Sequence, residues 1–165
     1  GCAVLLTLLK EELPLDCTFV FTAQEEVGNR GAFGAGFSVT PEIALVLDGA
    51  DTADAPGVPA HKRGCTLGKG VVLPVMDRGS IADRGLFEEL RSLAERETIL
   101  WQTSGSIPGR TDAAALQRTK AGVRTAMLSV PVRYHHTPSG LVSLGDVDGM
   151  LALTRAFLSD LAEKE

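Results

Sequence analysis

The stretch of sequence that decides the fold is Cys17-Thr18-Phe19-Val20-Phe21-Thr22-Ala23, which runs directly into Gln24-Glu25-Glu26. Its side chains are mainly aromatic or β-branched and do not alternate with polar ones, which predicts a strand buried on both faces. A second run of this kind is Ile43–Leu47, and it stops at Asp48. The segment between the two runs carries four glycines over residues 28–36 and predicts a turn with a short, weak helix.

Strands and helices alternate outward from this pair of strands toward both ends of the chain. Apolar residues recur at helical spacing over Gly1–Leu9, whereas residues 49–66 have no apolar period and predict a long functional loop. The order indicates an α/β fold with a mostly parallel sheet, built as a single domain over residues 1–165 without an internal repeat. Downstream of the loop, the patterns predict strands at Gly70–Val75, Thr98–Gln102 and Gly122–Val130 (closed by Pro131), and helices at Asp83–Glu97, Thr111–Thr119 and Leu144–Ala162.

Composition excludes several classes of function. The net charge is −5, no block of Lys or Arg stands out, and aromatic residues make up only 5%, so a nucleic-acid surface is not expected. No apolar run approaches the roughly 20 residues that cross a bilayer, so we expect no membrane partner. Cys2, Cys17 and Cys65 are odd in number and widely spaced, which argues against a disulfide framework. The cytoplasm is the expected compartment.

Acidic and imidazole side chains follow three of the predicted strands. Glu25-Glu26 follows the first strand, Asp48 ends the second, and His135-His136 comes shortly after the strand near the end of the chain. Parallel strands bring their carboxyl ends together, and carboxylates with an imidazole can hold a divalent transition metal such as zinc. The adjacent glutamates permit a division of labour, because one can bind metal while the other takes a proton from metal-bound water.

Each of these groups also has an ordinary structural interpretation. An Asp after a strand, such as Asp48, is most often a turn or helix-cap residue. The pair Glu25-Glu26 taken alone is more often a solvated acidic turn, and His135-His136 a pair of surface or hydrogen-bonded histidines. The conjunction of the three groups at strand ends is what favours a site.

Five segments, in order, resemble the signatures of the M42 family of metallo-aminopeptidases, which includes glutamyl aminopeptidases, the tetrahedral peptidases and proteins named endoglucanase M. The first is residues 21–32, with Phe-Thr-Ala-Gln-Glu-Glu-Val-Gly followed by Arg-Gly-Ala. The others are residues 46–57 (an Asp-bearing strand end and an Asp-x-Pro-Gly loop), 67–70 (Leu-Gly-Lys-Gly), 110–113 (Arg-Thr-Asp-Ala) and 131–138 (Pro-Val-Arg-Tyr-His-His-Thr-Pro).

This resemblance implies a role for each matching residue. Glu25 is implied as the general base, Glu26 and His136 as ligands of one metal, and Asp48 as a ligand of the other. The resemblance implies two divalent ions per complete site, with zinc as the favoured metal and cobalt or manganese as alternatives. The implied substrate is a short peptide that loses its N-terminal residue, and the implied assembly is a homo-oligomer. His135 falls at the variable position of its motif and receives no role.

Other matching positions are expected to act on the scaffold. Asp54 is interpreted as a structural residue that caps a turn, while Thr111 and Asp112 either shape the floor of the site or cap the following helix. The sequence departs from the family at Gly140, where Glu is usual, and at Arg110, where Gly is usual. Val71 also replaces the Pro of the Gly-Pro turn. The departures at residues 110 and 140 leave the preferred N-terminal residue open.

The resemblance implies the three-layer α/β/α sandwich of co-catalytic zinc peptidases, truncated at the N-terminal side. Family members carry a first metal-binding His and a metal-bridging Asp upstream of the segment that matches Gly1-Cys2-Ala3. We therefore expect residues 1–165 to be the C-terminal portion of a catalytic domain, inactive and weakly metal-binding when isolated. The alternative is a non-catalytic fragment or shortened paralogue that acts in assembly or partner binding. A glycan hydrolase is disfavoured, because no Asp/Glu pair is flanked by aromatic residues suited to bind sugar rings.

Overall fold

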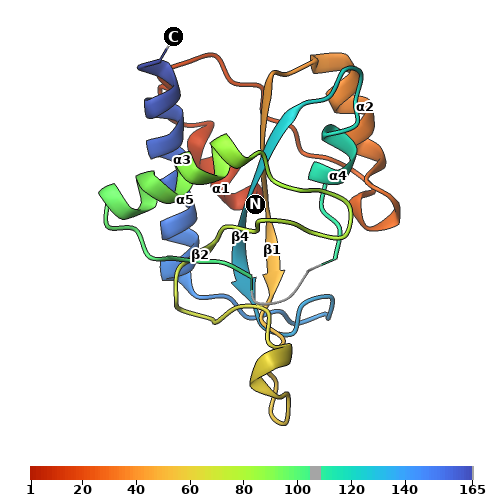
Figure 1. The fold of residues 1–165 in the computed structure, drawn as a ribbon, viewed down its shortest axis with the longest axis vertical. Helices are drawn as coiled ribbons and strands as arrows, with labels where there is room; N and C mark the ends of the chain where they lie inside the picture. Colours follow the sequence, from red (N-terminus) through yellow and green to blue (C-terminus); the bar gives the residue numbers. More distant parts are fainter. Residues whose placement is uncertain (105–108, 165) are drawn as a thin grey trace.

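A four-stranded sheet with helices on both sides forms the framework in the computed structural model, which describes residues 1–104 and 109–164 (Figure 1). The strands are β1 (Ile43–Asp51), β2 (Val71–Val72), β3 (Trp101–Gln102) and β4 (Arg124–Val132), in the order β1-β4-β2-β3. β1 is parallel to β4 and β2 to β3, but β2 is antiparallel to β4. The predicted α/β class is confirmed, and the sheet is mixed rather than mostly parallel.

Most of the backbone pairing in the sheet is between β1 and β4. Its register runs from Ile43 opposite Arg124 to Asp51 opposite Val132. The prediction that β1 stops at Asp48 is wrong, because β4 offers paired backbone groups for three further residues. Asp48 therefore lies within the strand, opposite Ser129, and its backbone is held by the sheet.

Pro131 lies inside β4, although it was expected to close the strand. The carbonyl of Val132 accepts a hydrogen bond from the Thr52 amide on the β1 side. Successive residues of a strand point their backbone groups to opposite sides, so Pro131 faces the β2 side. There β2 meets β4 only at Ser129, and the N–H that proline lacks costs no ladder bond.

The helices form two unequal groups. The helices α1 (Cys2–Leu8), α3 (Arg84–Arg96) and α5 (Leu144–Ala162) share the main apolar core with the sheet. α2 (Arg30–Val39) and α4 (Ala113–Leu116) lie together on the other side of the sheet (Figure 1). α3 begins where the Asp83 carboxylate accepts a hydrogen bond from the Leu86 amide at 3.0 Å, a side-chain N-cap. The two remaining helical turns are the 3-10 helices η1 (Glu25–Val27) and η2 (Ala60–Lys62).

The prediction of a buried strand at Cys17–Ala23 is wrong. The segment forms no ladder with any described strand, and Val20 and Phe21 are exposed. A strand needs a neighbour for its backbone groups, and β1 pairs on one side only, with β4. The strands predicted at 70–75 and 98–102 and the helix predicted at 111–119 form but are shorter, whereas α5 has the predicted bounds.

Among the described residues, no helix combines the length and the apolar composition that crossing a membrane requires.

Candidate active site

A cavity of about 640 Å³ opens where β1 and β4 end, beside the turn that follows residues 17–23. Glu25, Glu26, Asp48 and His136, the four residues singled out from the sequence, all line this cavity. They meet because β1 and β4 are parallel neighbours, so that Asp48 and the turn after β4 lie at the same end of the sheet. The structure thus brings the candidate residues together, while their chemical roles stay predictions.

The Glu25 side chain is held by a tight turn. Gln24 (φ 61°) and Asn29 (φ 55°) adopt left-handed backbone conformations on either side of η1, which non-glycine residues seldom do. Asn29 Nδ2 donates a hydrogen bond to Glu25 Oε1 at 2.9 Å. Burial raises the pKa of Glu25, and the neighbouring carboxylates of Asp48, Asp112 and Glu26 raise it further. A carboxyl group with a raised pKa exchanges protons more readily near neutral pH, which suits a general base.

Asp112 holds this turn in place through hydrogen bonds to residues on both sides of it. Its carboxylate is buried and accepts hydrogen bonds from Thr22 Oγ1 at 2.5 Å and Asn29 Nδ2 at 3.3 Å. It therefore ties the segment before Glu25 and the segment after it to the start of α4. Of the two roles expected for Asp112, the structure favours shaping the site, because its side chain makes no capping bond to α4.

Glu26 and His136 face each other across the cavity mouth. Glu26 Oε1 lies 3.2 Å from His136 Nε2, and both side chains are more than half exposed. Two ligands bound to one tetrahedral zinc ion at ~2.0–2.1 Å lie roughly 3.3 Å apart, so this pair fits a shared ion. Within residues 1–104 and 109–164, however, no group of three His, Cys, Asp or Glu side chains is placed to hold a metal. If the pair binds a metal, it would provide two of the three protein ligands usual in a catalytic zinc site.

Asp48 lies deeper in the cavity, beside His135. Its Oδ1 accepts a hydrogen bond from the Gly49 amide at 2.7 Å. Burial raises the pKa of Asp48, and this effect exceeds the opposing influence of the Gly49 amide and His135. A Cβ on Gly49 would lie 3.3 Å from His135 Nε2, so His135 packs directly over the β1 backbone. Sequence patterns offered no reason to include His135 beyond its place next to His136, and the centroids of the two rings are 4.0 Å apart.

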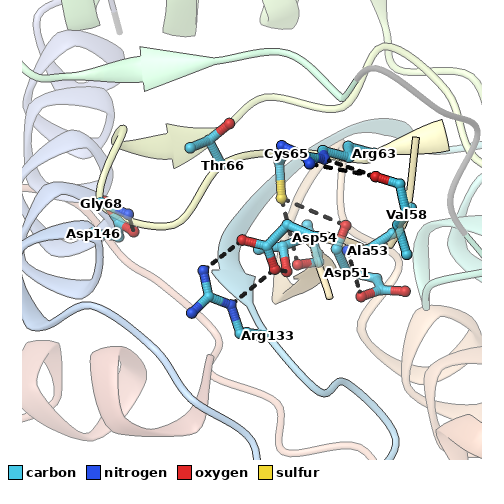
Figure 2. A network of polar contacts seen from close by, with 12 residues as sticks. Asp51, Ala53, Asp54, Val58, Arg63, Cys65, Thr66, Gly68, Arg133 and Asp146 are labelled. Carbon is cyan, nitrogen blue, oxygen red and sulfur yellow. Dashed lines mark hydrogen bonds and ion pairs between the residues drawn. The ribbon is translucent and has the colours of Figure 1, made fainter. Parts of the chain in front are cut away.

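An ion pair joins the loop after β1 to the end of β4, as Figure 2 shows. Arg133 donates from Nε to Asp54 Oδ1 at 2.9 Å and from Nη2 to Asp54 Oδ2 at 2.6 Å, and Thr52 Oγ1 donates to Asp54 Oδ1 at 2.7 Å. These bonds hold the pKa of Asp54 well below its usual range. The role of Asp54 as a structural turn cap stays a prediction, and its partner Arg133, which lies 79 residues away, was not foreseen.

Two further contacts stiffen the same region (Figure 2). The buried Asp146 carboxylate, in the first turn of α5, accepts hydrogen bonds from the amides of Gly68 and Gly70 at 2.7 and 2.8 Å. The Cys65 thiol lies 3.6 Å from the carbonyls of Ala50 and Asp51, and burial raises its pKa to about 12. Such a thiol stays protonated and acts as a packing group rather than a nucleophile.

Arginines also line the cavity, and the sequence patterns did not mark them as a group. Arg78 follows Asp77, whose carboxylate accepts bonds from the Thr111 amide and hydroxyl at 2.9 and 2.8 Å. Arg110 lines the same cavity, at the position where the resembling family usually carries glycine. The only sequence signal for Arg110 was that it departs from the family's usual glycine at the start of the segment at residues 110–113.

The fold and the cavity define an α/β domain with carboxylates and imidazoles gathered at the carboxyl ends of two parallel strands. The chain matches the M42 glutamyl aminopeptidase family over residues 1–153, and it belongs to that family. It is 37% identical over 147 residues to the lysyl aminopeptidase of Pyrococcus furiosus, covering 88% of this chain and 41% of that protein.

Two solved structures illustrate the same relationship. An aminopeptidase from the archaeon Desulfurococcus kamchatkensis superposes with a TM-score of 0.90 at 34% identity, over 96% of this chain and 46% of that one. The TET1 peptidase of Pyrococcus horikoshii, which can assemble into a tetrahedron or a large octahedral shell, superposes with a TM-score of 0.68 at 31% identity, over 84% and 39%. The chain therefore spans less than half the length of these relatives.

Proposed function

We propose that this chain supplies the general base and three metal ligands of a metal-dependent aminopeptidase that removes N-terminal residues from short peptides. The observation that carries the proposal is the convergence of Glu25, Glu26, Asp48 and His136 on one cavity. Membership of the M42 family supports it, as does the fact that the relatives from Pyrococcus furiosus and Desulfurococcus kamchatkensis are aminopeptidases. We also propose that the complete protein forms the three-layer α/β/α sandwich of the co-catalytic zinc peptidases.

The residues of this chain divide the work as follows. Glu26 and His136 would hold one divalent ion, and Asp48 would contribute to holding a second. Zinc is the first choice for both ions, with cobalt or manganese as alternatives, and when bound they supply an acidified water and polarise the scissile carbonyl. Asn29 occupies Oε1 of Glu25, which leaves Oε2 to accept a proton and deliver it to the leaving amine.

The test is Glu25→Gln in protein expressed from the complete native gene, so that any flanking sequence is present. We expect the variant to lose about 100-fold or more of kcat, because a general base contributes that much. Metal content, measured by mass spectrometry, should be unchanged, since Glu25 is not proposed as a ligand. Glu12→Gln is the matched control, because Glu12 is exposed and does not line the cavity. Full activity of Glu25→Gln with normal metal content would end the assignment.

Exposed apolar side chains favour a second candidate function, assembly or partner binding without catalysis. Val20, Phe21 and Val27 lead into α2, where Phe33 and Phe37 are also exposed. Apolar surface of this kind tends to be covered by another chain. We expect the 165-residue chain to self-associate at micromolar concentration, and Phe21→Ser to weaken that association in light scattering. A monodisperse monomer that unfolds cooperatively would contradict this candidate.

A further inference from the structure

A second cavity, of about 480 Å³, adjoins the candidate active site between the start of α2 and α4. Three of its lining residues are arginines, Arg30, Arg110 and Arg118, and Phe33 adds an aromatic wall. Gly28 and Arg110 line both cavities, so the two share a boundary. Gly28 leaves that boundary open, because a Cβ built on it would meet no heavy atom within 4 Å.

Among the residues that the structure describes, the three guanidinium groups have no acidic partner. None of them forms an ion pair with any carboxylate of the described residues, although the whole chain carries a net charge of −5. Five arginines elsewhere are each paired with Asp or Glu: Arg91, Arg96, Arg124, Arg133 and Arg155. Of the six arginines that form no ion pair with a described carboxylate, three therefore line this one cavity.

Two of these side chains are also held in position. Arg118 Nε donates to the Ala114 carbonyl at 2.8 Å, which fixes the plane of its guanidinium group. The side chain of Arg110 packs over Gly79, where an added Cβ would lie 3.0 Å from Arg110 Nε. Positioned guanidinium groups are suited to bind a carboxylate through two parallel hydrogen bonds.

We infer that the cavity formed by Arg30, Arg110 and Arg118 binds a carboxylate group of the peptide substrate. This inference rests on the proposed function, since it places the cleaved bond beside Glu25 and the carboxylate across the Gly28 boundary. Two groups of a short peptide carry this chemistry, an acidic side chain and the free C-terminus. The site favours peptides whose acidic side chain or free C-terminus can reach the arginines, and it disfavours the corresponding uncharged amides.

The experiment compares peptide pairs that differ only in charge, using protein from the complete native gene. One pair replaces an acidic residue by its amide, and the other replaces the free C-terminus by a carboxamide. Arg110→Gln should lower kcat/KM about 10-fold or more for the charged member of at least one pair, and change the uncharged member far less. The pair that responds identifies the source of the carboxylate. Arg84→Ala is the control, because Arg84 is exposed and unpaired on α3, across the sheet.

A binding measurement separates this inference from the proposed function. In ¹⁵N spectra of arginine side chains, glutarate should shift the signals of Arg30, Arg110 and Arg118, and its diamide should not. Arg110→Gln should weaken the glutarate effect at the other two arginines. If no peptide is hydrolysed but glutarate still binds here, the carboxylate site stands and the proposed function fails. Equal kcat/KM losses for charged and uncharged peptides, or no glutarate shift, would overturn the inference.

Discussion

The two sides of the sheet are stabilised in different ways. On the side of α1, α3 and α5, large apolar residues such as Phe157 and Leu128 are at most 1% exposed. On the side of α2 and the η1 turn, Phe37 is 60% exposed, and Phe21, shortly before that turn, is 45% exposed. The second side has a smaller apolar cluster of Val46, Ala113 and Met127, and it is also held by hydrogen bonds to Asp112 and by close backbone contacts. The candidate catalytic turn thus belongs to the less buried side, whose geometry depends on polar contacts.

Truncating one phenylalanine on each side should give the largest contrast. Phe157→Ala removes a fully buried ring and should lower the free energy of unfolding by about 3–5 kcal/mol. Phe37→Ala should cost less than about 1 kcal/mol, because its ring is mostly solvated. The only loss expected is a weak cation–π contact, in which Lys120 Nζ lies 4.7 Å from the ring centroid. Urea denaturation measures both. Equal losses would mean that the second side is as well packed as the first.

A pair of glycines in α2 should respond with opposite signs. A Cβ on Gly31 would lie 2.6 Å from the backbone N and O of Ala23, whose carbonyl accepts a hydrogen bond from the Gly31 amide. Gly31→Ala should therefore cost about 1–3 kcal/mol and disturb the turn that carries Glu25. Gly34 faces open space, so Gly34→Ala should stabilise the helix by up to about 1 kcal/mol. Thermal unfolding measures the stability of both variants. If Gly31→Ala is more stable than the wild type, the close contact with Ala23 does not limit this side of the sheet.

The ion pair between Asp54 and Arg133 should show the smallest effect, visible mainly as a pH dependence. Because the hydrogen bonds from Arg133 and Thr52 hold the pKa of folded Asp54 below its unfolded value of about 3.9, the ionised form stabilises the fold. This contribution is complete above the unfolded pKa and is lost as pH falls below about 4 toward the folded pKa. At neutral pH it should be about 1 kcal/mol, since Arg133 is partly solvated.

Comparing the wild type with Asp54→Asn between pH 7 and pH 3 isolates this contribution from other carboxylates. The difference in unfolding free energy should shrink as the pH falls. In an Arg133→Met background the Asp54→Asn change should have little pH dependence, because the partner is already absent. A constant difference across this range would show that the pair does not set the pKa of Asp54.

Several features were predictable because their signals are short-range. The apolar period of α5 spans 19 residues and gave both of its ends, and the Asp83 cap marks the start of α3. The four candidate site residues were also found from local motifs, and they do line one cavity, although residues 17–23 form no strand and Asp48 lies inside β1. By contrast, residues 17–23 have the composition of a strand but no strand to pair with, and composition alone cannot supply a partner.

The sequence by itself determined the α/β class, the positions of the main helices and the chemical identity of the groups that line the cavity. These follow from periodicity and residue type, which act over a few neighbouring residues. Only the tertiary structure decided that Asp54 meets Arg133, that Asp112 ties down the Glu25 turn, and that His135 packs over Gly49. Such contacts join segments separated by dozens of residues, and they depend on how the helices and strands pack against one another.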